Sequence, residues 1–80
     1  MNFEPVATLE DLDSLDEQDI IAGYRSAARG DPEPGANRGR AFWHGWRCGM
    51  FDLGELKPDV THRNLVALYL GRERGRLKGQ

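Results

Sequence analysis

Apolar residues recur along this chain at helical spacing, and almost nowhere in the alternation typical of a strand. Ser14 precedes Glu17 by three residues, the spacing of a capping box, and Gly30 follows the last periodic residue. The pattern therefore predicts a first helix from about Leu15 to Arg29. The next segment, GDPEPGAN, is rich in proline and glycine and predicts a loop.

Two further helices are predicted after this loop. Asn37 is a suitable cap for a helix that runs to about Asp52, and Gly54 lies just past its end. Thr61 is a suitable cap for a third helix, with Val60 and Leu65 spaced as a hydrophobic staple. The stretch TLEDLDSL predicts one short additional turn near the N-terminus.

Small residues recur on one face of each of the first two predicted helices. A glycine inside a helix costs about 1 kcal/mol relative to alanine, so close packing must offset that cost. Such ridges allow two backbones to approach closely. The ridge residues are Gly23 and Ala27 on the first helix, and Ala41, Gly45 and Gly49 on the second. We therefore predict an all-α fold, in which a small helical hairpin with a Gly/Ala crossing is joined by a third, C-terminal helix.

Charge divides the chain into an acidic and a basic part. Residues 1–19 carry seven acids and no Lys or Arg, and residues 20–80 carry eleven bases and six acids, so their net charges are −7 and +5. The organisation predicted is an acidic N-terminal arm (1–13), mobile or folded back, a helical domain (14–72) and a basic tail (73–80). The arm has three alternative roles: it repels phosphate, covers the basic surface, or meets another partner.

Size and cysteine content limit the class of protein. A chain of 80 residues forms one small core, and a domain of that size often depends on a partner or on forming a homodimer. Cys48 is the single cysteine, which excludes an intramolecular disulfide and a cysteine-rich zinc site. No apolar run reaches the length of a bilayer span, and the acidic N-terminus is unlike a signal peptide. We expect a cytoplasmic protein with no membrane partner.

The segment RGRAFWHGWRCGM concentrates aromatic and cationic side chains. At helical spacing, Trp46 belongs to an apolar side of the helix and is expected in the core, whereas Trp43 lies beside arginines and is expected to be partly accessible. An exposed tryptophan among arginines can stack on an RNA base or be buried by a protein partner. The candidate binding residues are Arg25, Arg29, Arg38, Arg40, Trp43 and Arg47.

Catalytic chemistry has little support in the sequence. His44 and His62 lack metal-ligand spacing to another candidate, and no base stands beside Cys48 in the sequence. The GDPEPG loop has neither the glycine spacing nor the preceding strand of a phosphate-binding motif. We expect a non-enzyme without cofactor or metal.

The motifs GYRSAARG and RAFWHGWRCGM, separated by a short proline-containing loop, resemble the ribosome modulation factor family over roughly residues 20–50. The matching positions are Gly23, Tyr24, Trp43, Gly45, Trp46 and Arg47. Members of that family are small bacterial two-helix proteins that bind the ribosome and its RNA, and relatives occur among phage-like proteins. The resemblance implies a translation regulator that binds rRNA through a basic, aromatic-containing helix.

Two functional hypotheses follow. The first is binding to the ribosome or rRNA, which the resemblance and the basic body favour. The second is a protein–protein interaction module, or an inhibitor from a phage or mobile element, that acts through the aromatic face and the acidic arm. The seven acids of the arm distinguish them, because they oppose RNA binding unless they are displaced.

Overall fold

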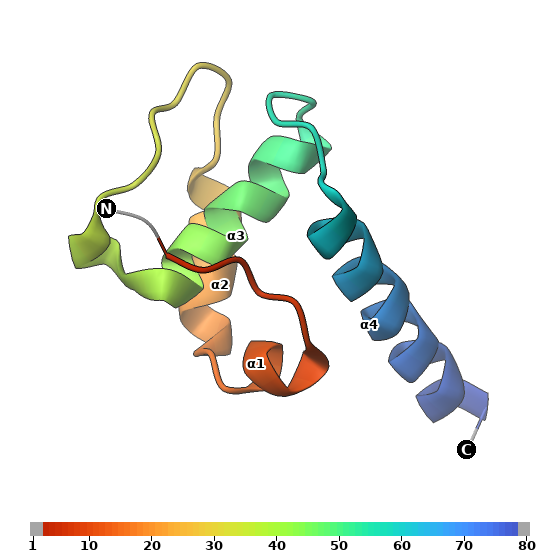
Figure 1. Cartoon of the computed structure of the whole chain (residues 1–80). Coiled ribbons are helices and arrows are strands. Elements are labelled where there is room, and N and C mark those ends of the chain that lie inside the picture. Colours follow the sequence, from red (N-terminus) through yellow and green to blue (C-terminus); the bar gives the residue numbers. More distant parts are fainter. Residues whose placement is uncertain (1–2, 79–80) are drawn as a thin grey trace.

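Helices make up the regular structure of residues 3–78, the part of the chain that the computed structural model describes, and this part contains no strand. Figure 1 shows the α-helices α1 (Leu9–Asp13), α2 (Glu17–Ser26), α3 (Gly39–Asp52) and α4 (Val60–Lys78). A 3₁₀ turn, Ala36–Arg38, precedes α3. The predicted all-α class is confirmed, and so is the short N-terminal turn, which is α1.

The start of α2 differs from the prediction. The side chain of Asp16 caps the helix, since its Oδ1 accepts hydrogen bonds from the backbone N–H groups of Gln18 at 2.8 Å and Asp19 at 3.3 Å. Ser14 ends α1 instead, and its Oγ donates to the Asp11 carbonyl. The predicted Ser14–Glu17 capping box is therefore wrong, because the capping serine already belongs to the preceding helix. Extended backbone at Ala27 also ends α2 earlier than predicted.

The start of α3 also differs, whereas its end is as predicted. The position before the helix is Arg38, which makes no side-chain capping bond, and Asn37 lies inside the 3₁₀ turn. The cap predicted at Asn37 is therefore wrong. The helix ends at Asp52, and Gly54 follows in the left-handed region with a φ of 78°, which favours glycine.

The crossing of α2 and α3 is the tightest contact in the fold, and glycines make it possible. A Cβ atom placed on Gly23 would lie 2.9 Å from the backbone nitrogen of Trp46, and one placed on Gly45 would lie 2.9 Å from that of Tyr24. A Cβ on Gly49 would lie 2.5 Å from the Cβ of Ala27. The predicted crossing is confirmed at these residues. Ala41, the remaining predicted ridge residue, is half-buried.

The N-terminal segment folds back over α3. Val6 is 2% exposed, and the ring of Phe3 lies 5.6 Å from that of Trp43. Figure 1 shows the segment before α1 crossing the face of α3. Of the three roles considered for the acidic arm, its described part adopts the folded-back arrangement.

Helix α4 lies apart from the other helices (Figure 1). Asp59 caps it, accepting from the His62 N–H at 2.8 Å, in place of the predicted Thr61. Val60 is 70% exposed, so the predicted staple to Leu65 is absent. The helix continues to Lys78, so residues 73–78 of the tail predicted at 73–80 are helical, and residues 79–80 lie outside the described part of the chain. The radius of gyration, 13.0 Å, exceeds the roughly 11.6 Å of a compact 80-residue domain, as expected when one helix projects.

Candidate functional site

Arg40, a predicted binding residue, forms hydrogen bonds within the protein instead. Its guanidinium forms two 2.7 Å hydrogen bonds to the two carboxylate oxygens of Asp11 and a further bond to the Glu4 carbonyl at 2.9 Å. The bond from Arg40 holds the pKa of the Asp11 carboxyl below its usual range. Arg40 therefore anchors the N-terminal segment onto α3.

Trp43 is buried, with 5% of its surface exposed, so the expectation of a partly accessible tryptophan is wrong. Its indole N–H donates to Glu33 Oε2 at 2.5 Å, and the ring of Phe3 covers it. Trp46, expected in the core, is 6% exposed and Phe42 is 8% exposed. Phe42, Trp43 and Trp46 of α3 thus belong to the core, and none of their rings offers an open face for stacking.

Arg47 covers the outer side of this core. Its guanidinium lies 4.8 Å from the centre of the Trp43 ring and 5.2 Å from that of Phe51, and it forms an ion pair with Asp59 at 3.5 Å. Only 16% of its side chain is exposed. Arg47 therefore links α3 to the segment that leads into α4.

Three of the predicted binding arginines remain on the surface. Arg25 is exposed, Arg38 lies with its guanidinium 4.0 Å from the centre of the Phe42 ring, and Arg29 is 71% exposed and paired with Glu55 at 3.4 Å. The structure thus separates the predicted set of six residues: Arg25, Arg29 and Arg38 face solvent, while Arg40, Trp43 and Arg47 stabilise the fold.

His44 and Cys48 lie one turn apart on α3, with Nε2 and Sγ 3.6 Å apart. Burial, assisted by the charges of His62, Arg47 and Arg40, lowers the pKa of His44 to about 4. Burial, assisted by Asp52, raises the pKa of Cys48 to about 11. Both shifts favour the neutral forms, so the pair is unlike the thiolate–imidazolium pair of a cysteine nucleophile.

Exposed apolar side chains gather on α4. Six large hydrophobic residues are exposed in the described part of the chain, and five of them lie on this helix. They are Val60, Val66, Leu68, Tyr69 and Leu70. Sequence reasoning missed this surface, because apolar residues surround the first half of the helix and no side stands out as the exposed one.

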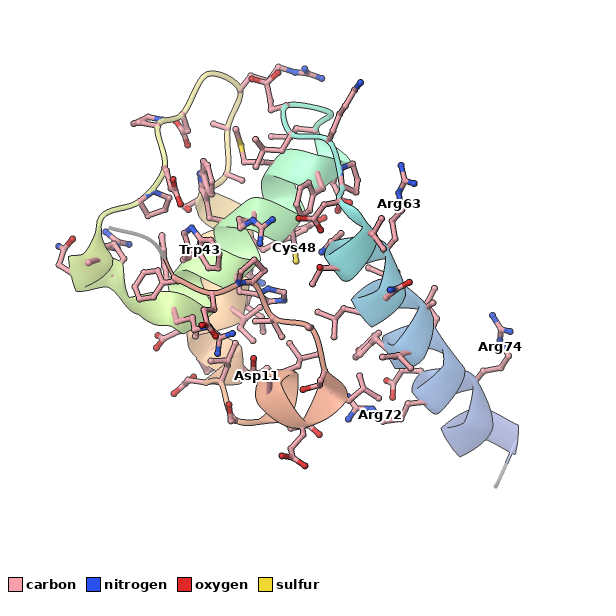
Figure 2. The ribbon with its side chains drawn as sticks, in the orientation of Figure 1. Asp11, Trp43, Cys48, Arg63, Arg72 and Arg74 are labelled. Atoms are coloured by element: carbon pink, nitrogen blue, oxygen red, sulfur yellow. The ribbon has the colours of Figure 1, made fainter. Side chains whose placement is uncertain are left out.

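The two sides of α4 can be assigned from their contacts. Leu65, Tyr69 and Arg72 share one face at helical spacing. Leu65 is 3% exposed, and Arg72 Nη1 bonds Asp13 Oδ2 at 2.8 Å, so this face is turned toward the body of the protein. Figure 2 shows Arg72 pointing toward α1, whereas Arg63 and Arg74 point away from the other helices.

The opposite side of the helix, which we call the outward face, combines apolar and cationic residues. It consists of Val60, Arg63, Ala67, Leu70 and Arg74, all exposed. Its two arginines are eleven residues apart, which corresponds to about 16 Å along a helix.

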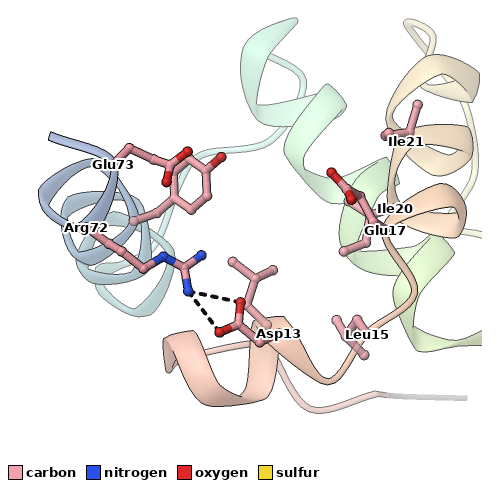
Figure 3. Close-up of a pocket in the computed structure, with 9 residues that line it drawn as sticks. Asp13, Leu15, Glu17, Ile20, Ile21, Arg72 and Glu73 are labelled. Atoms are coloured by element: carbon pink, nitrogen blue, oxygen red, sulfur yellow. Dashed lines mark hydrogen bonds and ion pairs between the residues drawn. The ribbon is translucent and has the colours of Figure 1, made fainter. Parts of the chain in front are cut away.

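An open groove of about 560 Å³ separates α4 from α1 and α2 (Figure 3). Its apolar wall includes Leu15, Ile20 and Ile21, and Glu17 lies on the same side. Among the described side chains, its lining contains three acids and one arginine. These residues are Asp13, Glu17, Glu73 and Arg72. The described lining of the groove therefore combines an apolar wall with carboxylates, of which Asp13 is paired with Arg72.

Residues 3–78 include no cluster of three His, Cys, Asp or Glu side chains arranged to hold a metal ion. Within the same described range, no helix has both the length and the hydropathy needed to cross a bilayer.

Comparisons with protein-family models, with curated proteins and with solved structures found no match to this chain, so the resemblance to the ribosome modulation factor family stays a prediction.

Proposed function

We propose that this chain is a non-catalytic protein-interaction module that binds its partner through the outward face of α4. The observation that supports this proposal is the concentration of exposed large hydrophobic residues on one helix, two of which, Val60 at 70% and Leu70 at 50% exposure, lie on the outward face beside Ala67. Soluble domains rarely leave a contiguous apolar surface uncovered unless it takes part in binding. The buried aromatic residues of α3 are not part of this surface.

Ribosome or rRNA binding, the other hypothesis, draws less support from the geometry. Stacking on a base requires an accessible ring, and Trp43 is covered. Arg40 is bound to an acid of the N-terminal segment, and Arg47 to Asp59. Phosphate would have to bind through the dispersed surface arginines alone.

Site-specific photo-crosslinking tests the proposal. A benzophenone amino acid replaces Leu70 on the outward face, and in a matched control it replaces Ala22, an exposed residue of α2. We expect protein adducts from position 70 in the cells that express the protein, few from position 22, and loss of the adducts when Arg74→Glu is added.

RNA adducts would contradict the proposal. So would co-sedimentation with ribosomes that weakens steeply with salt and is abolished when Arg25, Arg29 and Arg38 are replaced by Ala, because phosphate contacts release counterions. Both outcomes would favour the ribosome hypothesis. Absence of protein adducts at position 70 would also overturn the assignment of the outward face.

A further inference from the structure

We propose that His44 is an acid-sensitive junction in the fold: when its imidazole takes up a proton, α4 detaches from the body of the protein while the N-terminal segment stays in place. The proposal goes beyond the proposed function and does not depend on any partner of α4. It stands on the position of His44 and on the charges that the neighbouring elements present to it.

His44 is buried between the contacts that α3 makes with α1 and with α4. Its surface is 5% exposed, and it is the one buried charged or polar residue in the described part of the chain. One turn before it, Arg40 binds Asp11 of α1. Two turns after it, the ring of Phe51 lies 4.2 Å from that of His62 in α4. Because residues 40, 44 and 51 share one face of the helix, His44 lies between these two contacts.

The elements on the two sides of His44 present opposite charges to it. From α1 the carboxylate of Asp11 favours the protonated ring, whereas from α4 the imidazole of His62, once charged, disfavours it. The cations of α3 itself also disfavour it, and they are Arg40 and Arg47. A proton on His44 is therefore attracted by α1 and repelled by α4.

The closed structure holds His44 in its neutral form. Burial is the main reason that its pKa falls to about 4, and its Nε2 atom lies 3.6 Å from the thiol of Cys48, which is neutral as well. If a covering element moves away, water reaches the ring and its pKa returns toward 6.5. The open state then binds more protons than the closed state, so acid favours opening.

The element that leaves is α4, because its attachment is the weaker one. The described part of α4 contributes a single buried side chain, Leu65, at 3% exposure. The N-terminal segment contributes Val6, at 2% exposure, and the two 2.7 Å bonds between Asp11 and Arg40. Departure of α4 also separates His62 from the protonated ring, whereas departure of α1 would remove its acid. Opening of α4 is thus the less costly response to protonation.

Amide hydrogen exchange of the full chain, measured by NMR at pH 7 and pH 5, tests the proposal. Protection factors correct for the pH dependence of exchange itself and give the opening equilibrium of each helix. From pH 7 to pH 5 the opening constant of α4 should rise about tenfold, since most of the proton uptake by an exposed histidine occurs in this interval. The opening constant of α1 should stay within about twofold, because α1 remains bound to α3.

Two substitutions assign the effect to one ring. His44→Gln removes the titrating group, so the opening constant of α4 should be nearly the same at both pH values, whatever its absolute size. His62→Gln is the matched control, because it removes the other histidine at this junction and should keep most of the rise. A rise of the same size in His44→Gln would overturn the proposal, because another group would then control the opening.

The wild type alone also provides a decisive comparison if His44→Gln does not fold. A rise in the opening constant of α1 without one in α4 would show that the N-terminal segment is the element that leaves, and would overturn the proposal. Opening of α4 that is independent of pH would overturn it too. So would a common opening constant for α2, α3 and α4 at pH 5, since protonation would then unfold the whole domain.

Discussion

Gly23 and Gly45 are related reciprocally across the crossing of α2 and α3: a Cβ on either one would lie 2.9 Å from a backbone nitrogen of the opposite helix. The atoms that would be met are backbone atoms, namely those of Trp46 and Tyr24. Backbone atoms cannot move aside as a flexible side chain can. A side chain at either position would therefore force the two helices apart.

Gly45→Ala should therefore destabilise the protein by about 1–3 kcal/mol through overpacking, even though alanine is the better helix former. Chemical denaturation measures the change in the free energy of unfolding. Gly71→Ala is the matched control, because Gly71 is helical and a Cβ there meets nothing within 4 Å. It should stabilise α4 by up to about 1 kcal/mol. Equal effects of the two substitutions would contradict the crossing.

Trp43→Ala should lower the free energy of unfolding by about 3–5 kcal/mol, because it leaves a cavity beside Phe3 and removes the hydrogen bond to Glu33. Iodide quenching provides a second measurement. In a Trp46→Phe variant Trp43 is the only emitting tryptophan, and its fluorescence should be quenched far less than that of N-acetyltryptophanamide. Quenching close to that of the free compound would show that the ring is accessible.

Asp11→Asn should release the N-terminal segment from α3, since it removes the carboxylate that Arg40 binds through two hydrogen bonds. Limited proteolysis should then cleave residues 3–13 faster than in the wild type, while α3 stays protected. Arg29→Gln is the control, because it breaks a solvent-exposed ion pair that should contribute little. An unchanged cleavage rate for Asp11→Asn would show that the packing of Val6 alone holds the segment.

Acid should destabilise the fold through His44. Its pKa is about 4 in the folded protein, against 6.5 for the ordinary side chain, so the unfolded chain binds more protons between these values. The free energy of unfolding should therefore fall as the pH drops from about 6.5 toward 4, by up to roughly 3 kcal/mol from this group.

NMR titration of the two histidine rings tests the assignment. His44 should stay neutral to lower pH than His62, whose pKa burial also lowers but whose ring is less enclosed. A His44 ring that titrates near 6.5 would contradict its burial.

The helix crossing was predictable because its determinants are local: the spacing of Gly23 and Ala27, and of Gly45 and Gly49, is visible within each helix. The environment of Trp43 was not predictable in the same way. Its covering ring, Phe3, is distant in sequence, and its acceptor, Glu33, lies in a loop without periodicity.

Contacts between residues that are distant in sequence also explain why the partners of the arginines and the packing face of α4 were not predictable. Nothing in the sequence around Arg40 indicates that Asp11, 29 residues away, is its partner. The third helix was predictable as a helix, but apolar residues surround its first half, so no single side identifies itself as the packing face. Tertiary contacts decide which side of the helix is covered. The candidate site could therefore be identified only from the structure.

The slender attachment of α4 has a dynamic consequence. One buried leucine, Leu65, the ring contact between His62 and Phe51 and the ion pairs of Arg47 and Arg72 hold this helix to the body. A unit with so few buried contacts opens at a lower free energy than the whole domain. Amide hydrogens of α4 should therefore exchange with solvent through a local opening, while those of α2 and α3 exchange only through global unfolding. A partner that covers α4 should slow exchange in α4 alone.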